Sequence, residues 1–292
     1  MTISSEEVAQ GNLVRRIGGE LDRWPMTLKT GSAILIVIGL AGIFAPILTP
    51  YDPFSQDLAN ALLAPSLAHP FGTDNFGRDV LTRVLYGIRI DLPFGFFTTY
   101  VPLVYGIVMG ALAGYWGGWC DSLLMRLLDV TVAFPFLILI IVIVAILGPG
   151  IQNIYLAIFL TAWTMYARLA RAEMLIERNK DYILAAHSLG YGSGRIVFRH
   201  AIPNVVNSSI VFSMSDFVLN ILLVSGLSFL GLGVAPPTPE WGAMIAEGRD
   251  FMLEAWWIST LPGVALVATG TALCLIGDGL AQRLGERRHA LI

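Results

Sequence analysis

The ionisable side chain in the most apolar setting is Asp216, which stands alone in the otherwise uncharged run 205–232. Asn220 follows one helical turn later, so a helix would place both side chains on one face. A carboxylate at the centre of a membrane costs roughly 2.5 to 3.5 kcal/mol on insertion scales, so it should face a partner or water rather than lipid. The chemistry that this pair offers is the binding of a cationic group. A polar packing contact between two helices is the alternative.

Histidine, cysteine and lysine offer no further chemistry. The four histidines are scattered, and the spacing of the two cysteines matches no metal or redox pattern. Neither Lys29 nor Lys180 follows a glycine, so the chain lacks a phosphate-binding loop of the Gly-Lys type. We therefore expect no catalytic residue, metal or cofactor in this chain. If ATP powers the protein, another chain must hydrolyse it.

The composition is that of a membrane protein. Of the 292 residues, 55% are hydrophobic and 13% are charged, and the mean hydropathy is +0.70. Soluble domains average about 25% charged residues, so this chain lacks the polar residues to cover itself in water. The net charge of −3 and the absence of a basic run with interleaved aromatics argue against nucleic-acid binding.

Six apolar runs predict six membrane-spanning helices, because about 20 helical residues cross a bilayer core. The first run follows a polar leader, 1–29, that is too long for a usual signal peptide, so we interpret the run as an uncleaved helix. A cleaved signal peptide is the weaker alternative. The turn-rich segment 49–92 is expected in water outside the cell. The predicted spans are 30–48, 93–113, 123–147, 154–166, 205–232 and 256–276.

The distribution of positive charge predicts the orientation. With both termini in the cytoplasm, 14 of the 18 lysines and arginines lie inside the cell. The positive-inside rule therefore favours this topology, with cytoplasmic tails at 1–29 and 283–292.

Glycine and proline mark two features of the spans. Gly106, Gly110 and Gly114 recur every four residues, a spacing that lets helix backbones approach closely, either within this subunit or against a second one. Pro135 and Pro262 should kink the third and the sixth span.

A polar island at 181–204 separates two apolar runs. A helix over 181–189 would gather Tyr182, Ala185, Ala186 and Leu189 on one face. Gly190 would stop that helix, Ser193 would cap a second short helix, and Pro203 would end it. A cytoplasmic helix with small residues on its exposed face could lie in a groove of another protein or rest on lipid headgroups.

A charged cluster precedes the second span. Asp74, Arg78, Asp79 and Arg83 alternate in sign between the turn-forming glycines and the apolar run. We interpret them as a self-satisfied turn and helix cap, in preference to a contact with the substrate.

The polar island resembles the EAA loop of binding-protein-dependent ABC importer permeases. Ala185, Ala186, Gly190, Ile202 and Pro203 match the pattern of that loop, whereas Leu184 replaces its glutamate. Two further stretches, 69–92 (HPFGTDNFGRDVLTRVLYGIRIDL) and 228–248 (SFLGLGVAPPTPEWGAMIAEG), resemble the C-type permeases of dipeptide, oligopeptide and nickel importers. With GYWGGWCD, MRLLD and GDGL, the resemblance covers about 30–282.

The resemblance implies an all-α, type I importer permease of a prokaryotic inner membrane, with a core at 93–282. It would pair with a B-type permease, receive a peptide or a related small solute from an extracytoplasmic binding protein, and be driven by two cytoplasmic ATPases that bind ATP and Mg. The resemblance and the helical spacing of the polar island together assign Tyr182, Ala185, Ala186, Leu189, Gly190 and Pro203 to ATPase coupling. In the outer loop 231–256, which by resemblance would meet the binding protein, we expect Pro237, Glu240 and Trp241 to make the contact. Independently of the resemblance, the depth of Asp216 in its span leads us to expect Asp216 and Asn220 at the translocation path.

Two other classes of protein are less consistent with the sequence. An ion-driven secondary carrier would use ion-binding carboxylates near the membrane centre, and Asp216 is the single candidate at such a depth in the predicted spans. An intramembrane enzyme would need a nucleophile with its base or a metal constellation, and His187 and His200 have no evident nucleophile beside them.

Overall fold

The computed structural model describes residues 24–289. The predicted tail 1–29 therefore lies mostly, and the tail 283–292 partly, outside the described residues. Every regular element in the described part is helical, as the fold class predicts. The main helices are α2 (Met26–Ile43), α3 (Ala45–Leu48), α4 (Val80–Trp116), α5 (Gly118–Val132), α6 (Phe136–Leu147), α7 (Ile151–Thr161), α8 (Trp163–Glu177), α9 (Asp181–Ser188), α10 (Ser193–Arg195), α11 (Ile202–Phe229), α12 (Trp241–Gly248) and α13 (Trp257–His289).

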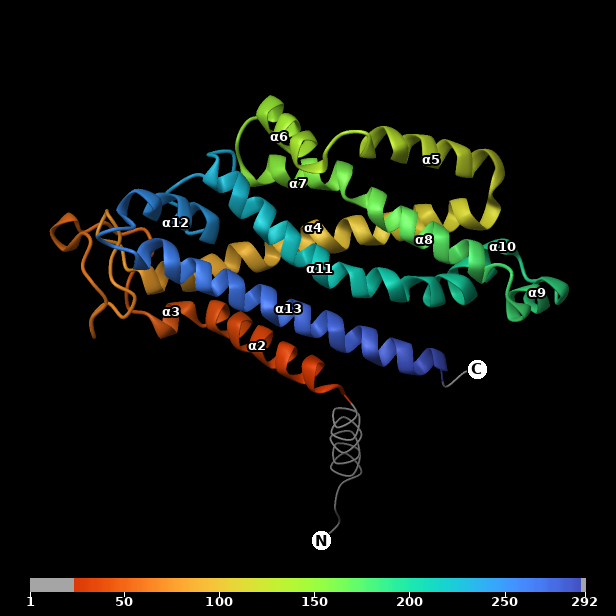
Figure 1. Cartoon of the computed structure of the whole chain (residues 1–292), viewed down its shortest axis with the longest axis horizontal. Helices are drawn as coiled ribbons and strands as arrows, with labels where there is room; N and C mark the ends of the chain where they lie inside the picture. The colour runs from red at the N-terminus through yellow and green to blue at the C-terminus, as the bar shows by residue number, and fades with distance from the viewer. Residues whose placement is uncertain (1–23, 290–292) are drawn as a thin grey trace, which may run out of the picture.

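The long helices lie side by side in a slab (Figure 1). Helix α4 packs against α8 and α11, and α13 packs against α11 and α2. Helices α9 and α10 occupy one end of the slab, whereas α12 and the segment 49–79 occupy the other (Figure 1). Many apolar side chains of the long helices face outward, as in a protein whose solvent is lipid.

Four helices of the described part are long and apolar enough to cross a membrane. They are Met26–Ile43, Val80–Trp116, Ser193–Phe229 and Trp257–Gly285, and the bent pair α5 and α6 makes a fifth if it counts as one span. The predicted number of six spans is not confirmed. The run 154–166 does not form one helix of its own, because it is divided at Ala162 between α7 and α8.

Pro135 breaks the third predicted span, as expected. Helix α5 ends at Val132, α6 begins at Phe136, and the two axes differ by 81°. A proline lacks the amide hydrogen of the helical ladder, and its ring clashes with the preceding turn. Pro262, by contrast, lies inside the continuous helix α13.

The second long helix begins at Val80, earlier than the boundary at Pro93 that hydropathy predicts. Asp79 caps it, since the carboxylate accepts a hydrogen bond of 2.7 Å from the amide of Thr82. The water-exposed segment predicted at 49–92 therefore includes the first turns of α4. Arg83 in those turns pairs with Glu247, and Arg89 donates to the carbonyls of Gly42 and Ile43, so their polarity does not signal a loop.

The repeated glycines serve packing within this subunit. A methyl group at Gly110 would lie 2.1 Å from the carbonyl oxygen of Ala167 on α8. At Gly106 it would lie 2.8 Å from the carbonyl oxygen of Trp163. Because any side chain would separate the two helices, the structure decides between the two alternatives in favour of the contact between α4 and α8.

Candidate functional site

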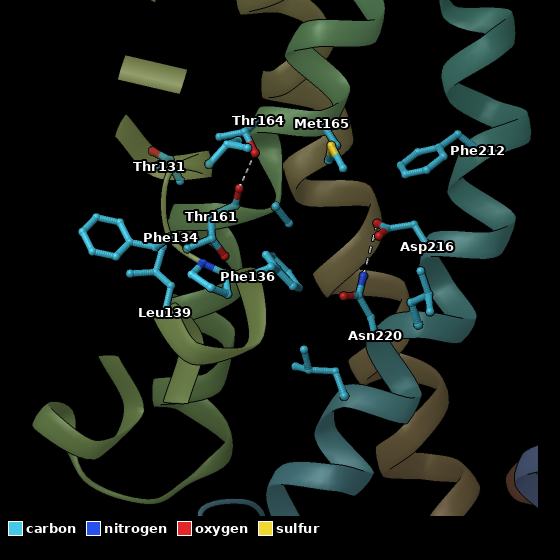
Figure 2. Close-up of a pocket in the computed structure, with 15 residues that line it drawn as sticks. Thr131, Phe134, Phe136, Leu139, Thr161, Thr164, Met165, Phe212, Asp216 and Asn220 are labelled. Atoms are coloured by element: carbon cyan, nitrogen blue, oxygen red, sulfur yellow. Dashed lines mark hydrogen bonds between the residues drawn. The ribbon is translucent and has the colours of Figure 1, made fainter. Parts of the chain in front are cut away.

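A cavity of about 440 Å³ lies between α11 and the two helix breaks, α5/α6 and α7/α8 (Figure 2). Its wall is mostly apolar. Asp216 and Asn220 lie on the α11 side and face the cavity, as Figure 2 shows. The lining residues are Thr131, Val132, Phe134, Pro135, Phe136, Leu139, Thr161, Ala162, Thr164, Met165, Phe212, Asp216, Leu219, Asn220 and Leu223.

Asp216 is held by hydrogen bonds on one of its two oxygens. The buried hydroxyl of Tyr166 donates to Oδ2 over 2.7 Å, and Nδ2 of Asn220 donates to the same oxygen over 3.3 Å. Nδ2 of Asn220 also donates to Oγ1 of Thr99 on α4 over 3.0 Å. The carboxylate of Asp216 thus makes the polar packing contacts of the alternative interpretation, and it also faces a cavity.

Helix α9 presents a different face from the predicted one. Ala186 is only 6% exposed and packs with Ile183 against Met174 and Ile196. The prediction that Ala186 shares an exposed face with Tyr182, Ala185 and Leu189 is therefore wrong. Periodicity alone could not distinguish the side of the helix that faces the bundle.

The exposed surface of α9 and of the residue after it is apolar. Leu184 is 51% exposed, Leu189 is 72% exposed, and Ala185 lies between them in an exposed position. Leu184, which departs from the pattern of the EAA loop, is thus a surface residue.

Tyr182 anchors α9 to the end of α8. Its hydroxyl donates to the buried carboxylate of Glu177 and accepts a hydrogen bond of 3.0 Å from Nδ2 of Asn204. Lys180 pairs with the same glutamate over 2.7 Å. Burial, together with the acceptor that Glu177 provides, raises the pKa of Tyr182, so the phenol remains a donor at neutral pH.

Gly190 ends α9 as predicted. Its φ of +77° is the left-handed conformation that favours glycine, and the amides of Gly190 and Tyr191 donate to the carbonyls of His187 and Ala186 over 2.9 and 3.1 Å. This pair of bonds is a Schellman motif, which satisfies the last carbonyls of the helix.

The chain beyond Gly190 forms one continuous helix, Ser193–Phe229, and the prediction that Pro203 ends a short helix is wrong. Ser193 is the first helical residue, and its side chain makes no capping bond. A π-helical turn at Ile196–Ala201 precedes Pro203. Such a turn widens the backbone where the proline ring would otherwise clash. The side chain of Asn204 satisfies the carbonyl of His200 over 2.8 Å.

Two of the three residues predicted to contact a binding protein are fully buried. The carboxylate of Glu240 caps α12, accepting from the amides of Gly242 and Ala243 over 2.7 and 2.8 Å. The indole of Trp241 donates to the carbonyl of Val84 over 3.0 Å. These side chains have no surface to offer another protein, so their predicted role is corrected to a structural one, whereas Pro237 is exposed.

The charged cluster near the start of α4 forms a turn and a helix cap, as interpreted from the sequence, but its two arginines also need Glu247 from outside the cluster. Arg78 pairs with Asp74 over 2.6 Å and with Glu247 of α12 over 2.8 Å. Arg83 contacts the same glutamate over 3.3 Å. All of these groups except Glu247 are almost completely buried, so the cluster fastens α12 to the start of α4.

Comparison with known proteins identifies the family. The model of the family described as "Binding-protein-dependent transport system inner membrane component" matches residues 106–289, more than half of the chain. The chain belongs to this family. A second model, the "N-terminal TM domain of oligopeptide transport permease C", matches residues 29–65 of the permease.

The permease is similar to curated transport proteins along most of its length. It is 41% identical to the dipeptide transport system permease protein DppC of Alkalihalophilus pseudofirmus over 88% of this chain and 84% of that protein. It is 40% identical to the di/tripeptide permease DppC of Pseudomonas aeruginosa, over 88% of this chain and 87% of that protein. It is also 40% identical to the glutathione permease GsiD of Pectobacterium atrosepticum, over 91% of this chain and 88% of that protein.

The fold is also found in a solved transporter structure. An inward-facing form of the MetNI methionine ABC transporter aligns with a TM-score of 0.54 at 16% identity, covering 69% of this chain and 96% of that chain. The permease therefore has the type I ABC importer fold and functions as the membrane-spanning permease of an importer. Its family consists of transport proteins, not enzymes.

Several residues of these sites carry little or no signal in the sequence. Tyr166 and Thr99 support Asp216 and Asn220 from other helices, and Glu177 and Glu247 hold α9 and α12. Tyr166, Thr99 and Glu247 lie far in sequence from the residues that they help to hold. Glu177 is an ordinary residue at the end of a helix. For Glu177 the spacing to Lys180 was a weak local signal.

Proposed function

We propose that this permease forms half of the translocation pathway of a peptide importer. The observation that carries the proposal is the 41% identity with a dipeptide permease along 88% of the chain. The relatives are named for dipeptides, di/tripeptides and glutathione, so the solute class is a short peptide or a related small solute. The other half of the pathway is a B-type permease, a different chain with which this one forms a heterodimer.

ATP drives the transport through two partner ATPases in the cytoplasm. This chain has no Gly-Lys phosphate loop, so ATP and Mg bind to those partners and no cofactor binds here. Helix α9 is the part that docks: Leu184, Ala185 and Leu189 form its contact surface. Tyr182 and Ala186 fix α9 to the bundle.

The coupling path leads from α9 to the cavity. Gly190 sets the turn after α9, and the continuous helix that follows passes Pro203 and carries Asp216 and Asn220. A movement of α9 on ATP binding therefore reaches the cavity wall through one rigid element. Alternating access follows if that movement opens the cavity first to one side of the membrane and then to the other, so that Asp216 and Asn220 border the translocation path.

The positive charges orient the permease in the inner membrane of a prokaryote. Both termini and α9 lie in the cytoplasm, and α12 lies outside the cell. An extracytoplasmic binding protein delivers the solute to the outer end. There the exposed Pro237 and Leu253 are available for contact.

Reconstitution tests the proposal against an ion-driven carrier. The permease is purified with its B-type partner and ATPases, placed in proteoliposomes, and supplied with a binding protein loaded with a radiolabelled dipeptide. Uptake should require internal ATP and persist when ionophores abolish all ion gradients. Uptake that follows a proton or sodium gradient without ATP would instead establish the carrier mechanism.

A further inference from the structure

We propose that the cavity beside α11 binds a protonated amine, with Asp216 as its counter-ion. The inference rests on the proposed function, because an importer exposes this cavity to its passing solute. The inference adds to the proposed function the chemical class of the group that the cavity binds. Four features of the cavity support it: the free oxygen of Asp216, the absence of a lining cation, the orientation of the polar groups, and the apolar wall.

Among the residues that the structure describes, hydrogen bonds reach one of the two carboxylate oxygens of Asp216. Tyr166 and Asn220 both donate to Oδ2. Within residues 24–289, no side chain or amide donates a hydrogen bond to Oδ1, and no ion pair reaches this carboxylate. Figure 2 shows the carboxylate directed from α11 toward the cavity. Oδ1 is therefore the acceptor that a bound group would meet.

The cavity contains no positive charge of its own. None of its fifteen lining residues is a lysine, arginine or histidine. A carboxylate in such a setting is costly unless a cation pairs with it, and its attraction for a cation is stronger there than in water. The electrostatics of the lining therefore favour a cationic ligand.

The other polar side chains leave acceptors, not donors, free. The hydroxyls of Thr131, Thr161 and Thr164 donate to backbone carbonyls over 3.0, 2.8 and 2.9 Å. The amide nitrogen of Asn220 donates to Thr99 and Asp216. An ammonium group has three donors and no acceptor, which matches this lining, whereas an anion would find no free side-chain donor.

The helix ends at the cavity do not reverse this preference. Helices α5 and α7 end there, with partial negative charge, while α6 and α8 begin there, with partial positive charge. The opposed dipoles largely cancel, so the full charge of Asp216 decides the sign of the ligand.

The rest of the cavity wall is suited to a small apolar group of the ligand. Phe134, Phe136 and Leu139 line the side of the cavity opposite α11, and Phe212 lies beside Asp216 in Figure 2. The volume of about 440 Å³ lies in the range of roughly 300–1,000 Å³ that is usual for small-molecule sites. A primary amine with one aromatic or aliphatic group fits both the charge and the space.

Binding of tritiated 2-phenylethylamine to the complete transporter, in lipid nanodiscs and without nucleotide, tests the inference. We expect saturable binding that unlabelled 2-phenylethylamine displaces and that the neutral isostere 2-phenylethanol does not. Asp216→Asn should weaken binding at least tenfold. Asp250→Asn, which neutralises an exposed carboxylate at the far end of the molecule, should bind as the wild type does.

Unchanged amine binding by Asp216→Asn, or equal displacement by the alcohol, would overturn the inference. ATP hydrolysis by the copurified complex shows whether the variant has assembled. If Asp216→Asn does not assemble, Leu139→Trp tests the site instead, because the larger indole would fill the cavity from α6 and leave the carboxylate unchanged. Unchanged amine binding by Leu139→Trp would then refute the site. A failed amine site with ATP-driven dipeptide uptake intact would leave the proposed function standing.

Discussion

The hydroxyl of Tyr166 on α8 donates a hydrogen bond of 2.7 Å to Asp216 on α11. Tyr166 also packs against Gly106 of α4 and against the ring of Phe212. One buried side chain therefore joins the contact between α4 and α8 to the wall of the cavity. The orientation of the cavity carboxylate depends on how tightly these helices pack.

Removing the Tyr166 hydroxyl should take away a hydrogen bond to Asp216 while the ring keeps its packing in the core. A hydrogen bond to a charged group contributes roughly 1.5 to 3 kcal/mol, so Tyr166→Phe should lower the stability of the purified complex by about that amount. Thermal unfolding followed by fluorescence measures the change. Tyr155→Phe is the matched control, since Tyr155 makes aromatic contacts but no hydrogen bond from its hydroxyl within the described residues. An equal effect of both changes would show that the bond to Asp216 is not the cause.

Gly110→Ala should separate α4 from α8. The added methyl would lie 2.1 Å from the carbonyl oxygen of Ala167, and backbone atoms cannot yield as a flexible side chain can. Overpacking of this kind costs about 1 to 3 kcal/mol, so we expect a lower unfolding temperature and a lower yield. Gly39→Ala has no neighbour within 4 Å and should be neutral or slightly stabilising. Wild-type stability of Gly110→Ala would mean that the two helices are not in this contact.

Ala185→Asp and Ala186→Asp should fail in different ways. Ala186 is buried against the bundle, so an aspartate there should destabilise the α9 region and lower the yield. Ala185 is exposed, so its aspartate variant should fold normally but retain less ATPase if α9 docks as proposed. Membrane yield and copurified ATPase are measured for both variants. A well-folded Ala186→Asp protein beside normal ATPase retention by Ala185→Asp would contradict both assignments.

Glu247→Gln should destabilise the end of the molecule that contains α12. The change removes the carboxylate that faces Arg78 and Arg83, leaving Asp74 to balance two buried guanidinium groups. Breaking one partner of a buried ion pair costs roughly 3 to 5 kcal/mol. Hydrogen exchange of α12 and thermal unfolding report the loss. Glu254→Gln, at an exposed position in the segment after α12, should leave both measurements unchanged. Similar results for the two variants would remove the argument for the buried cluster.

The membrane class, the helical fold and the family could be predicted from the sequence because each depends on local features. Apolar runs, the break at Pro135 and the stop at Gly190 depend on backbone chemistry that neighbouring residues determine. The resemblance of the polar island to an EAA loop likewise needs only residue types in register.

The sides of the helices and the partners of the charges were decided by tertiary structure. Ala186 and Glu240 are chemically suited to a surface. Yet Ala186 is buried in a cluster with Met174 of α8, and Glu240 is buried where it caps α12. Hydropathy placed the start of α4 at Pro93, because it could not show that Arg83 meets Glu247 of the distant helix α12. Asp216 was identifiable from sequence as a polar residue in a span. Only the packing of α8 and of the two broken helices around α11 showed which oxygen is bound and which faces the cavity, because these contacts join residues distant in sequence.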